Sequence, residues 1–125
     1  MKRLRFSEPL PQLVLSGKKD TTWRINDDKN ISENDELSLC DINNNEFAKA
    51  KVLWTRETEF AKLSKKDLEG HEKFSSDEEM YKTYSKYYGI IVTPKTLVKI
   101  IKFSILKKAS QDQIKNPAQV QRANV

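Results

Sequence analysis

The sequence is poor in the residues that build covalent or metal-based scaffolds. It contains one cysteine, Cys40, and one histidine, His71, among 125 residues. A single cysteine excludes an internal disulfide and suits a reducing compartment, and one cysteine with one histidine cannot form a typical zinc site. We therefore expect a cytoplasmic protein without metal or cofactor, in which Cys40 is a small buried residue of a strand.

Long hydrophobic runs are also lacking. No apolar stretch approaches the ~20 residues that a membrane-spanning helix needs. The leucines near the N-terminus are interrupted by Glu8, Pro9 and Pro11, which makes this segment a poor signal peptide. With 37% hydrophobic and 33% charged residues, the chain is typical of one water-soluble domain with no membrane partner, and we expect a monomer.

Acidic and basic residues are unevenly distributed along the chain, so that some segments have few charges of one sign. Residues 1–24 carry six basic and two acidic side chains, residues 25–50 carry two and seven, and residues 81–105 carry five lysines and no acid. If the first and last strands pair, one face of the sheet would be basic and would suit a polyanion. The alternative is that the lysines only keep the exposed face of a sheet soluble.

The hydrophobic pattern predicts a mainly β, α+β domain. Alternating or β-branched segments predict strands, and two segments with capping residues predict a short helix near the start and one later helix. Five to six strands bounded by turns at this spacing indicate a small β-barrel. The expected strands are 2–6, 18–25, 36–42, 46–60 and 97–106, the expected helices lie within 7–17 and 75–88, and 107–125 is expected to be a flexible polar tail after a domain of residues 1–106.

Two elements have a predicted buried face. In the long strand the alternation favours the parity of Ala48, Ala50, Val52 and Trp54 as the core side. In the later helix, a serine at 75 or 76 with a glutamate three positions on predicts a capping box. The buried face of that helix is expected to consist of Met80, Tyr84, Tyr87 and Tyr88.

The segment SGKKDTTWRI, residues 16–25, concentrates chemically active side chains behind a glycine. A guanidinium such as Arg24 grips phosphate or carboxylate with two parallel donors. A partly desolvated lysine could activate the hydroxyl of Thr22 as a nucleophile. The alternative is a surface strand with a cross-strand ion pair. Strict alternation puts Lys19 and Thr22 on opposite faces, so a shared site requires an irregular backbone near Asp20.

The same segment carries a resemblance to a known family. FSEPLPQLVLSGKKDTTWRI, a following DELSL, LSKKDLEGHEKFSSDEEMYKTYSKYYG and VKIIKF together resemble the ASCH domain family over about residues 2–105. Within that pattern Gly17, Lys18, Lys19, Thr22 and Arg24 match, whereas Asp20 departs from it. The resemblance implies a PUA-like β-barrel with a cleft, and a role in binding RNA or handling modified nucleosides.

The resemblance also implies roles for individual residues. The ligand cleft would lie between the strand Lys19–Arg24 and the loop around Glu69, with Lys18 and Arg24 as ligand-binding residues. Small bacterial ASCH proteins of one branch remove the acetyl group from 4-acetylcytidine with Lys, Thr and Glu. Carried over, Lys19 would be the base, Thr22 the nucleophile, and Glu69, or alternatively Glu72, the acid.

The aromatic residues leave two interpretations open. Trp54 and Tyr88 could stack on a nucleobase, or they could be ordinary core residues. The sequence is therefore compatible with an RNA- or nucleoside-binding module, with an amidohydrolase, and with a regulatory protein that binds a small anionic ligand.

Overall fold

Five strands form one sheet in the computed structural model, which describes residues 1–109. The strands are β1 (Lys2–Phe6), β2 (Thr21–Arg24), β3 (Glu36–Asp41), β4 (Glu46–Glu59) and β5 (Leu97–Lys108). Their order across the sheet is β1-β3-β4-β5-β2, with β1 and β3 parallel and every other pair antiparallel. The mainly β fold class that the sequence predicts is confirmed, with five strands.

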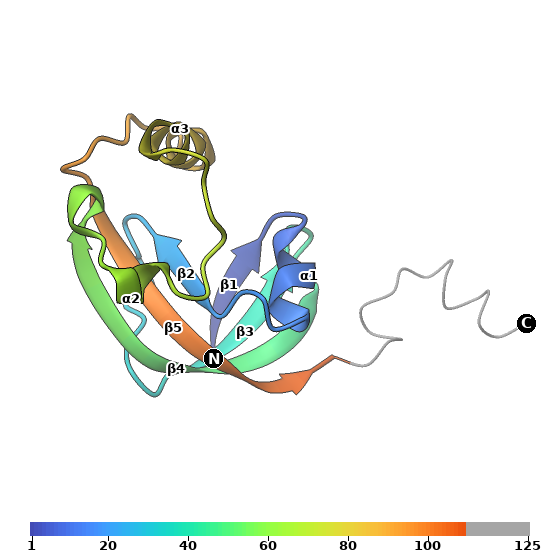
Figure 1. Cartoon of the computed structure of the whole chain (residues 1–125). Helices are drawn as coiled ribbons and strands as arrows, with labels where there is room; N and C mark the ends of the chain where they lie inside the picture. Colours follow the sequence, from blue (N-terminus) through green and yellow to red (C-terminus); the bar gives the residue numbers. More distant parts are fainter. Residues whose placement is uncertain (110–125) are drawn as a thin grey trace, which may run out of the picture.

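The sheet curls because its two long strands bend. Register shifts interrupt the pairing of β4 with β5 at Lys49/Ala50 and at Val52/Trp54, and that of β3 with β4 at Leu39/Cys40. Such bulges increase the local twist of a strand. The two edge strands β1 and β2 therefore approach each other, and the Nη2 atom of Arg24 donates to the carbonyl of Arg5 at 3.0 Å. The result is the half-barrel seen in Figure 1.

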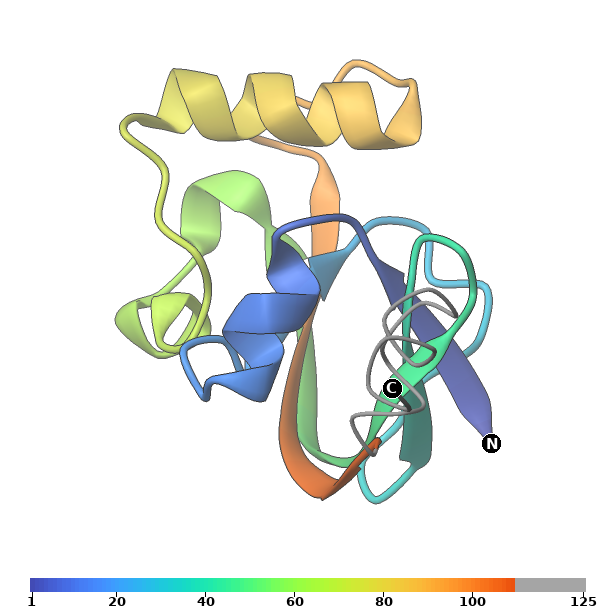
Figure 2. The same cartoon turned by 90° about the vertical axis from the view of Figure 1, so that its right-hand side faces the viewer.

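The helices lie at the rim of this half-barrel. They are α1 (Leu10–Leu15), a 3-10 turn η1 (Phe60–Lys62), α2 (Lys65–Leu68) and α3 (Asp77–Tyr88). Figures 1 and 2 show α3 across the end toward which β1 and β2 run. Within residues 1–109, no helix is long and apolar enough to cross a membrane.

Helix α3 begins and ends where the sequence indicates. Ser76 is the N-cap and accepts a hydrogen bond from the amide of Glu79, and Gly89 closes the helix in a left-handed conformation. Met80 and Tyr84 are buried as expected. Tyr87, in contrast, is 54% exposed, and Tyr88 is half-buried.

The burial of β4 departs from simple alternation. Ala48, Ala50 and Val52 are fully buried as predicted. Phe47, on the other parity, is also buried, and the centroid of its ring lies 6.0 Å from that of Phe6. Trp54, on the predicted core side, is only half-buried. The bulges explain this difference, because an extra residue in one strand shifts the side chains beyond it.

The first and last strands do not pair. β1 is an edge strand beside β3, while β5 lies between β4 and β2. A basic face built from these two strands is therefore not formed. The predicted tail, 107–125, overlaps the end of β5 at Lys107 and Lys108, and from residue 110 on it lies outside the described residues.

Candidate functional site

The turn between α1 and β2 directs Lys19 inward. Gly17 has a φ of +82°, which a glycine adopts without steric cost, and the amides of Lys18 and Lys19 both donate to the carbonyl of Leu13. The strand β2 begins only at Thr21, so strand alternation does not govern the side chain of Lys19. That side chain is buried, with 2% of the residue exposed.

Lys19 meets a carboxylate beneath the surface. Its Nζ donates to Glu72 Oε1 at 2.5 Å and to the carbonyl of Thr21 at 2.7 Å. Burial lowers the pKa of Lys19, although the attraction of Glu72 opposes this effect. Burial also disfavours the charged form of Glu72, but the lysine outweighs it and the pKa of Glu72 lies below its usual value. The two side chains are thus joined by a short hydrogen bond, and each favours the charged form of the other.

The buried ring of His71 lies next to Lys19 and Glu72. Its ring stacks on Trp23 at 3.6 Å between centroids, with an interplanar angle of 14°. Nδ1 lies 2.8 Å from the carbonyl oxygen of Glu72, and Nε2 lies 3.0 Å from the hydroxyl of Tyr84. Burial, with the nearby Lys19, lowers the pKa of His71 to about 4, so the ring is neutral at pH 7. Because a carbonyl oxygen can only accept, Nδ1 carries the proton and Nε2 accepts from Tyr84.

A cavity of about 340 Å³ opens between β2 and α3. Thr22, Arg24 and Glu72 supply polar atoms to its wall, and three tyrosines of α3 supply aromatic surface, namely Tyr84, Tyr87 and Tyr88. Tyr84 and Tyr88 are nearly parallel, with 12° between their planes. Lys19 is not part of the wall, but its partner Glu72 is.

Arg24 is an unusual group in this wall. Its guanidinium carbon lies 4.8 Å from the centroid of the Phe6 ring, and its Nε is buried without a hydrogen-bond partner within residues 1–109. In the same residues no carboxylate lies within ion-pair distance of it. Burial lowers the pKa of Arg24, yet a guanidinium remains cationic at neutral pH. The cavity therefore contains a positive charge that the described residues do not neutralise.

The structure brings together some of the residues singled out in the sequence. Thr22, Arg24 and Tyr88 line the cavity with Glu72, and Lys19 touches Glu72. Thr22 lines the cavity although only 4% of the residue is exposed, and within residues 1–109 its hydroxyl makes no hydrogen bond.

Other candidates lie apart from the cavity. Lys18 is exposed on the turn, and Trp54 lies under the ammonium of Lys66 at 4.9 Å. The side chain of Glu69 is exposed, and only its carbonyl takes part, accepting from the Thr21 hydroxyl at 2.7 Å.

Sequence reasoning did not assign Trp23, Tyr84 and Tyr87 to the site. The helical spacing of the tyrosines predicts the buried face of a helix, but a band of tyrosines also indicates a surface that is both apolar and hydrogen-bonding.

The fold and the cavity together define a class of protein: a small PUA-like α+β domain with a ligand-sized cavity at the rim of a half-barrel. No protein-family model matches the sequence, and no curated protein matches it.

Solved structures do match. Protein EF3133 from Enterococcus faecalis is similar with a TM-score of 0.69 and 16% identity, over 82% of this chain and 72% of that one. The ASCH domain from Lactobacillus crispatus is similar with a TM-score of 0.61 and 11% identity, over 78% and 70%. The hypothetical protein PH0355 has a TM-score of 0.65 and 26% identity, over 85% and 100%. The chain therefore resembles ASCH domains and has their fold.

Proposed function

We propose that the domain of residues 1–106 binds a nucleoside, free or within RNA, in the cavity between β2 and α3. The observation that carries this proposal is the combination of three tyrosines with the unneutralised guanidinium of Arg24 in one cavity of about 340 Å³. Aromatic rings stack on any nucleobase, and stacking contributes about 1–3 kcal/mol for each base. The chain shares its fold with the Lactobacillus crispatus ASCH domain, and the resemblance to ASCH domains implies a role with RNA or modified nucleosides.

The polar groups of the wall are suited to a pyrimidine with an exocyclic amine. An ionised carboxylate such as Glu72 only accepts hydrogen bonds, and a cytosine N4 amine donates them. A guanidinium such as Arg24 only donates, and the O2 atom of cytosine accepts. Both groups line the cavity together with the hydroxyl of Thr22, which can do either. Cytidine and its N4-substituted derivatives are therefore the first ligands to test.

A second candidate is an amidohydrolase that deacetylates 4-acetylcytidine. The contact that favours it is that between the buried Lys19 and Glu72, beside the hydroxyl of Thr22. In this mechanism Thr22 Oγ1 attacks the acetyl carbonyl carbon while Lys19, in its neutral form, takes the hydroxyl proton. The bond from that carbon to N4 then breaks, and the proton passes to the departing amine. Water finally hydrolyses the acetyl-threonine to acetate, and cytidine leaves.

In the resemblance Glu69 or Glu72 could supply the acid, and the geometry favours Glu72. The carboxylate of Glu72 accepts directly from the Lys19 ammonium, whereas the carboxylate of Glu69 points to solvent. Glu72 would hold Lys19 in place and stabilise the ammonium that forms during the attack.

One experiment separates the candidates. Isothermal titration with cytidine and 4-acetylcytidine measures binding, and chromatography of the same mixtures detects release of cytidine and acetate. Binding without release supports the binding module. Release that is lost in Thr22→Ala and kept in the control Thr58→Ala, a threonine of β4 outside the cavity wall, supports the amidohydrolase.

Two further outcomes would contradict these candidates. If neither nucleoside binds and inorganic phosphate does, the third interpretation, a protein that binds a small anionic ligand, is favoured. If release of cytidine survives Thr22→Ala, Thr22 is not the nucleophile.

A further inference from the structure

A second cavity, of about 460 Å³, adjoins the first on the side of β1. Within residues 1–109, its lining includes four basic residues and no acidic residue. Its lining consists of Arg3, Leu4, Arg5, Arg24, Lys29 and Asn44. Four cations around one hollow repel each other, and an anion bound between them would relieve this repulsion.

Arg5 and Arg24 line both cavities, so they form the wall between them. They come from opposite edges of the sheet, and the hydrogen bond from Arg24 to the Arg5 carbonyl fixes their relative position. The Arg24 guanidinium is held on one side by this bond and by the Phe6 ring. It can therefore serve a ligand that extends from one cavity into the other.

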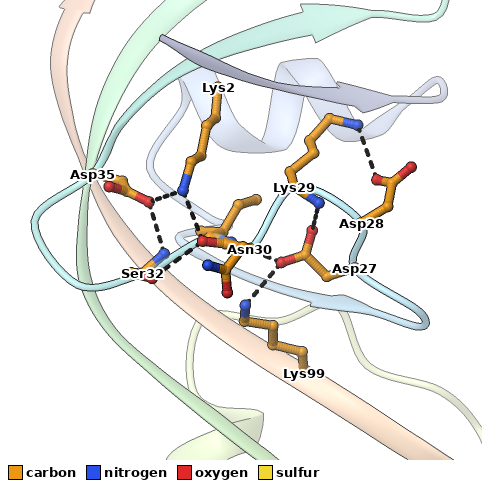
Figure 3. A network of polar contacts seen from close by, with 9 residues as sticks. Lys2, Asp27, Asp28, Lys29, Asn30, Ser32, Asp35 and Lys99 are labelled. Carbon is orange, nitrogen blue, oxygen red and sulfur yellow. Dashed lines mark hydrogen bonds and ion pairs between the residues drawn. The ribbon is translucent and has the colours of Figure 1, made fainter.

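The acidic residues of the neighbouring loop are mostly occupied elsewhere, as Figure 3 shows. Asp27 accepts from Lys99 at 2.8 Å and from the amide of Ile31 at 2.8 Å. Asp35 accepts from Lys2 at 2.7 Å and from the amide of Ser32 at 2.8 Å.

Asp28, in the same loop, pairs with a lining residue of the second cavity. Asp28 lies 3.6 Å from the ammonium of Lys29, but the Asp28 side chain is 86% exposed. Such an exposed pair is worth little, so it leaves Lys29 available to a ligand.

We propose that this second cavity binds a phosphate group of the ligand whose base lies in the first cavity, so that the ligand is a nucleotide rather than a free nucleoside. Arginine binds phosphate through two parallel hydrogen bonds, and Arg3, Arg5 and Arg24 surround the hollow. The proposal rests on the proposed function for the position of the base. The phosphate belongs either to a mononucleotide or to the phosphodiester of RNA.

Isothermal titration of the full chain at low salt tests the proposal. The ligands are cytidine, cytidine 5′-monophosphate, the dinucleotide CpC and ribose 5-phosphate. We expect the phosphate to raise the affinity over that of cytidine by about tenfold or more, because hydrogen bonds between charged groups are about twice as strong as neutral ones. In Arg3→Gln/Lys29→Gln this gain should be lost while the affinity for cytidine stays the same, because neither residue lines the first cavity.

A matched control removes the same charge elsewhere. Lys51→Gln/Lys107→Gln changes two exposed lysines outside both cavities and should keep the gain. A gain for the monophosphate alone assigns the site to a mononucleotide, and an equal gain for CpC assigns it to RNA.

Three other outcomes would refute the phosphate site, the base cavity or both. Equal affinity for cytidine and both phosphorylated ligands refutes the phosphate site and leaves the proposed function intact. Equal affinity for ribose 5-phosphate and cytidine 5′-monophosphate refutes the base cavity and leaves the phosphate site. If none of the four binds, both proposals are wrong.

Discussion

Glu69 and Glu72 are three positions apart in one loop, and their side chains have different environments. Gly70 and His71 lie between them, and Gly70 takes a φ of +75° that turns the chain. The carboxylate of Glu72 therefore faces the Lys19 ammonium, while that of Glu69 faces water. At the scale of one residue, the direction of a side chain depends on a backbone angle that the sequence motif does not specify.

His71 should make the stability of the protein depend on pH. Its pKa in the folded state is about 4, against an ordinary value of 6.5, because burial disfavours the charged ring. The unfolded chain therefore binds the proton more tightly, and the free energy of unfolding should fall as the pH drops from about 6.5 to 4. The loss has an upper limit of roughly 3.5 kcal/mol, at about 1.4 kcal/mol for each pH unit.

Urea unfolding at pH 7, 6, 5 and 4 measures this loss. His71→Gln removes the titrating ring and should give a flatter profile above pH 4.5. Asp27, Asp67 and Glu72 have lowered pKa values, so their contribution is lost at more acidic pH in both proteins. A His71→Gln profile as steep as that of the wild type between pH 5 and 6.5 would contradict the assignment.

At the scale of elements, the loop after α2 holds the start of β2. The carbonyl of Gly70 accepts hydrogen bonds from the amides of both Asp20 and Thr21, and Asp20 in turn pairs with Lys102 of β5 at 2.7 Å. Two segments about 50 residues apart in the chain are thus joined at the position where Lys19 turns inward. The irregular start of β2 is a consequence of these contacts.

Gly70→Ala should disturb this junction. A Cβ at this position would lie 1.7 Å from Asp20 Oδ1, and the φ of +75° is strained for any residue with a Cβ. We expect the free energy of unfolding to fall by about 1–2 kcal/mol, with roughly 1 kcal/mol from the backbone and up to about 1 kcal/mol from moving the Asp20 carboxylate away from Lys102. Binding of cytidine should weaken as well, because Lys19 and Thr22 flank the displaced residues.

Gly17→Ala is the matched control for Gly70→Ala. Gly17 has a φ of +82°, but a Cβ there would meet nothing within 4 Å. This variant should therefore lose only the backbone contribution and keep its ligand affinity. Equal losses of stability in the two variants would show that the contact with Asp20 is not important.

At the scale of the whole molecule, much of the basic charge is neutralised internally. Lys99 and Lys102 of β5 pair with Asp27 and Asp20, and Lys2 of β1 pairs with Asp35. Lys99 and Lys102 therefore do not contribute to an open basic face. Four other cations lie together around the second cavity, at the meeting point of the two sheet edges.

This arrangement predicts a modest salt dependence of RNA binding. Each phosphate neutralised by a protein cation contributes about 0.7 to the slope of log K against log salt for a single strand. Titration of a short oligocytidylate at several salt concentrations should give a slope that becomes shallower by roughly 0.7 in Arg3→Gln/Lys29→Gln, because the two substitutions remove cations from one phosphate site. Lys99→Gln should leave the slope unchanged, because Lys99 is already paired. A larger change in Lys99→Gln than in the double variant would contradict this distribution of charge.

Much of the fold follows from local patterns in the sequence. The period-two runs that became β3, β4 and β5 and the capped helix α3 lie close to their predicted places. These elements depend on neighbours within a few residues, which is the range over which propensity, alternation and capping act. The sequence did not predict the bulges of β4, because they depend on how β4 pairs with its neighbouring strands.

The sequence by itself determined the elements and the chemical types near the site, including Lys19, Thr22 and Arg24. Only the tertiary structure decided which of them are in contact. The curled sheet brings Arg24 to the carbonyl of Arg5, and the turn at Gly70 directs Glu72 to Lys19. The tyrosines of α3 line the cavity. The physical reason is that a cavity and a buried ion pair are made by residues distant in the chain. The distances between these residues depend on how the whole sheet packs, and a local sequence pattern does not determine that packing.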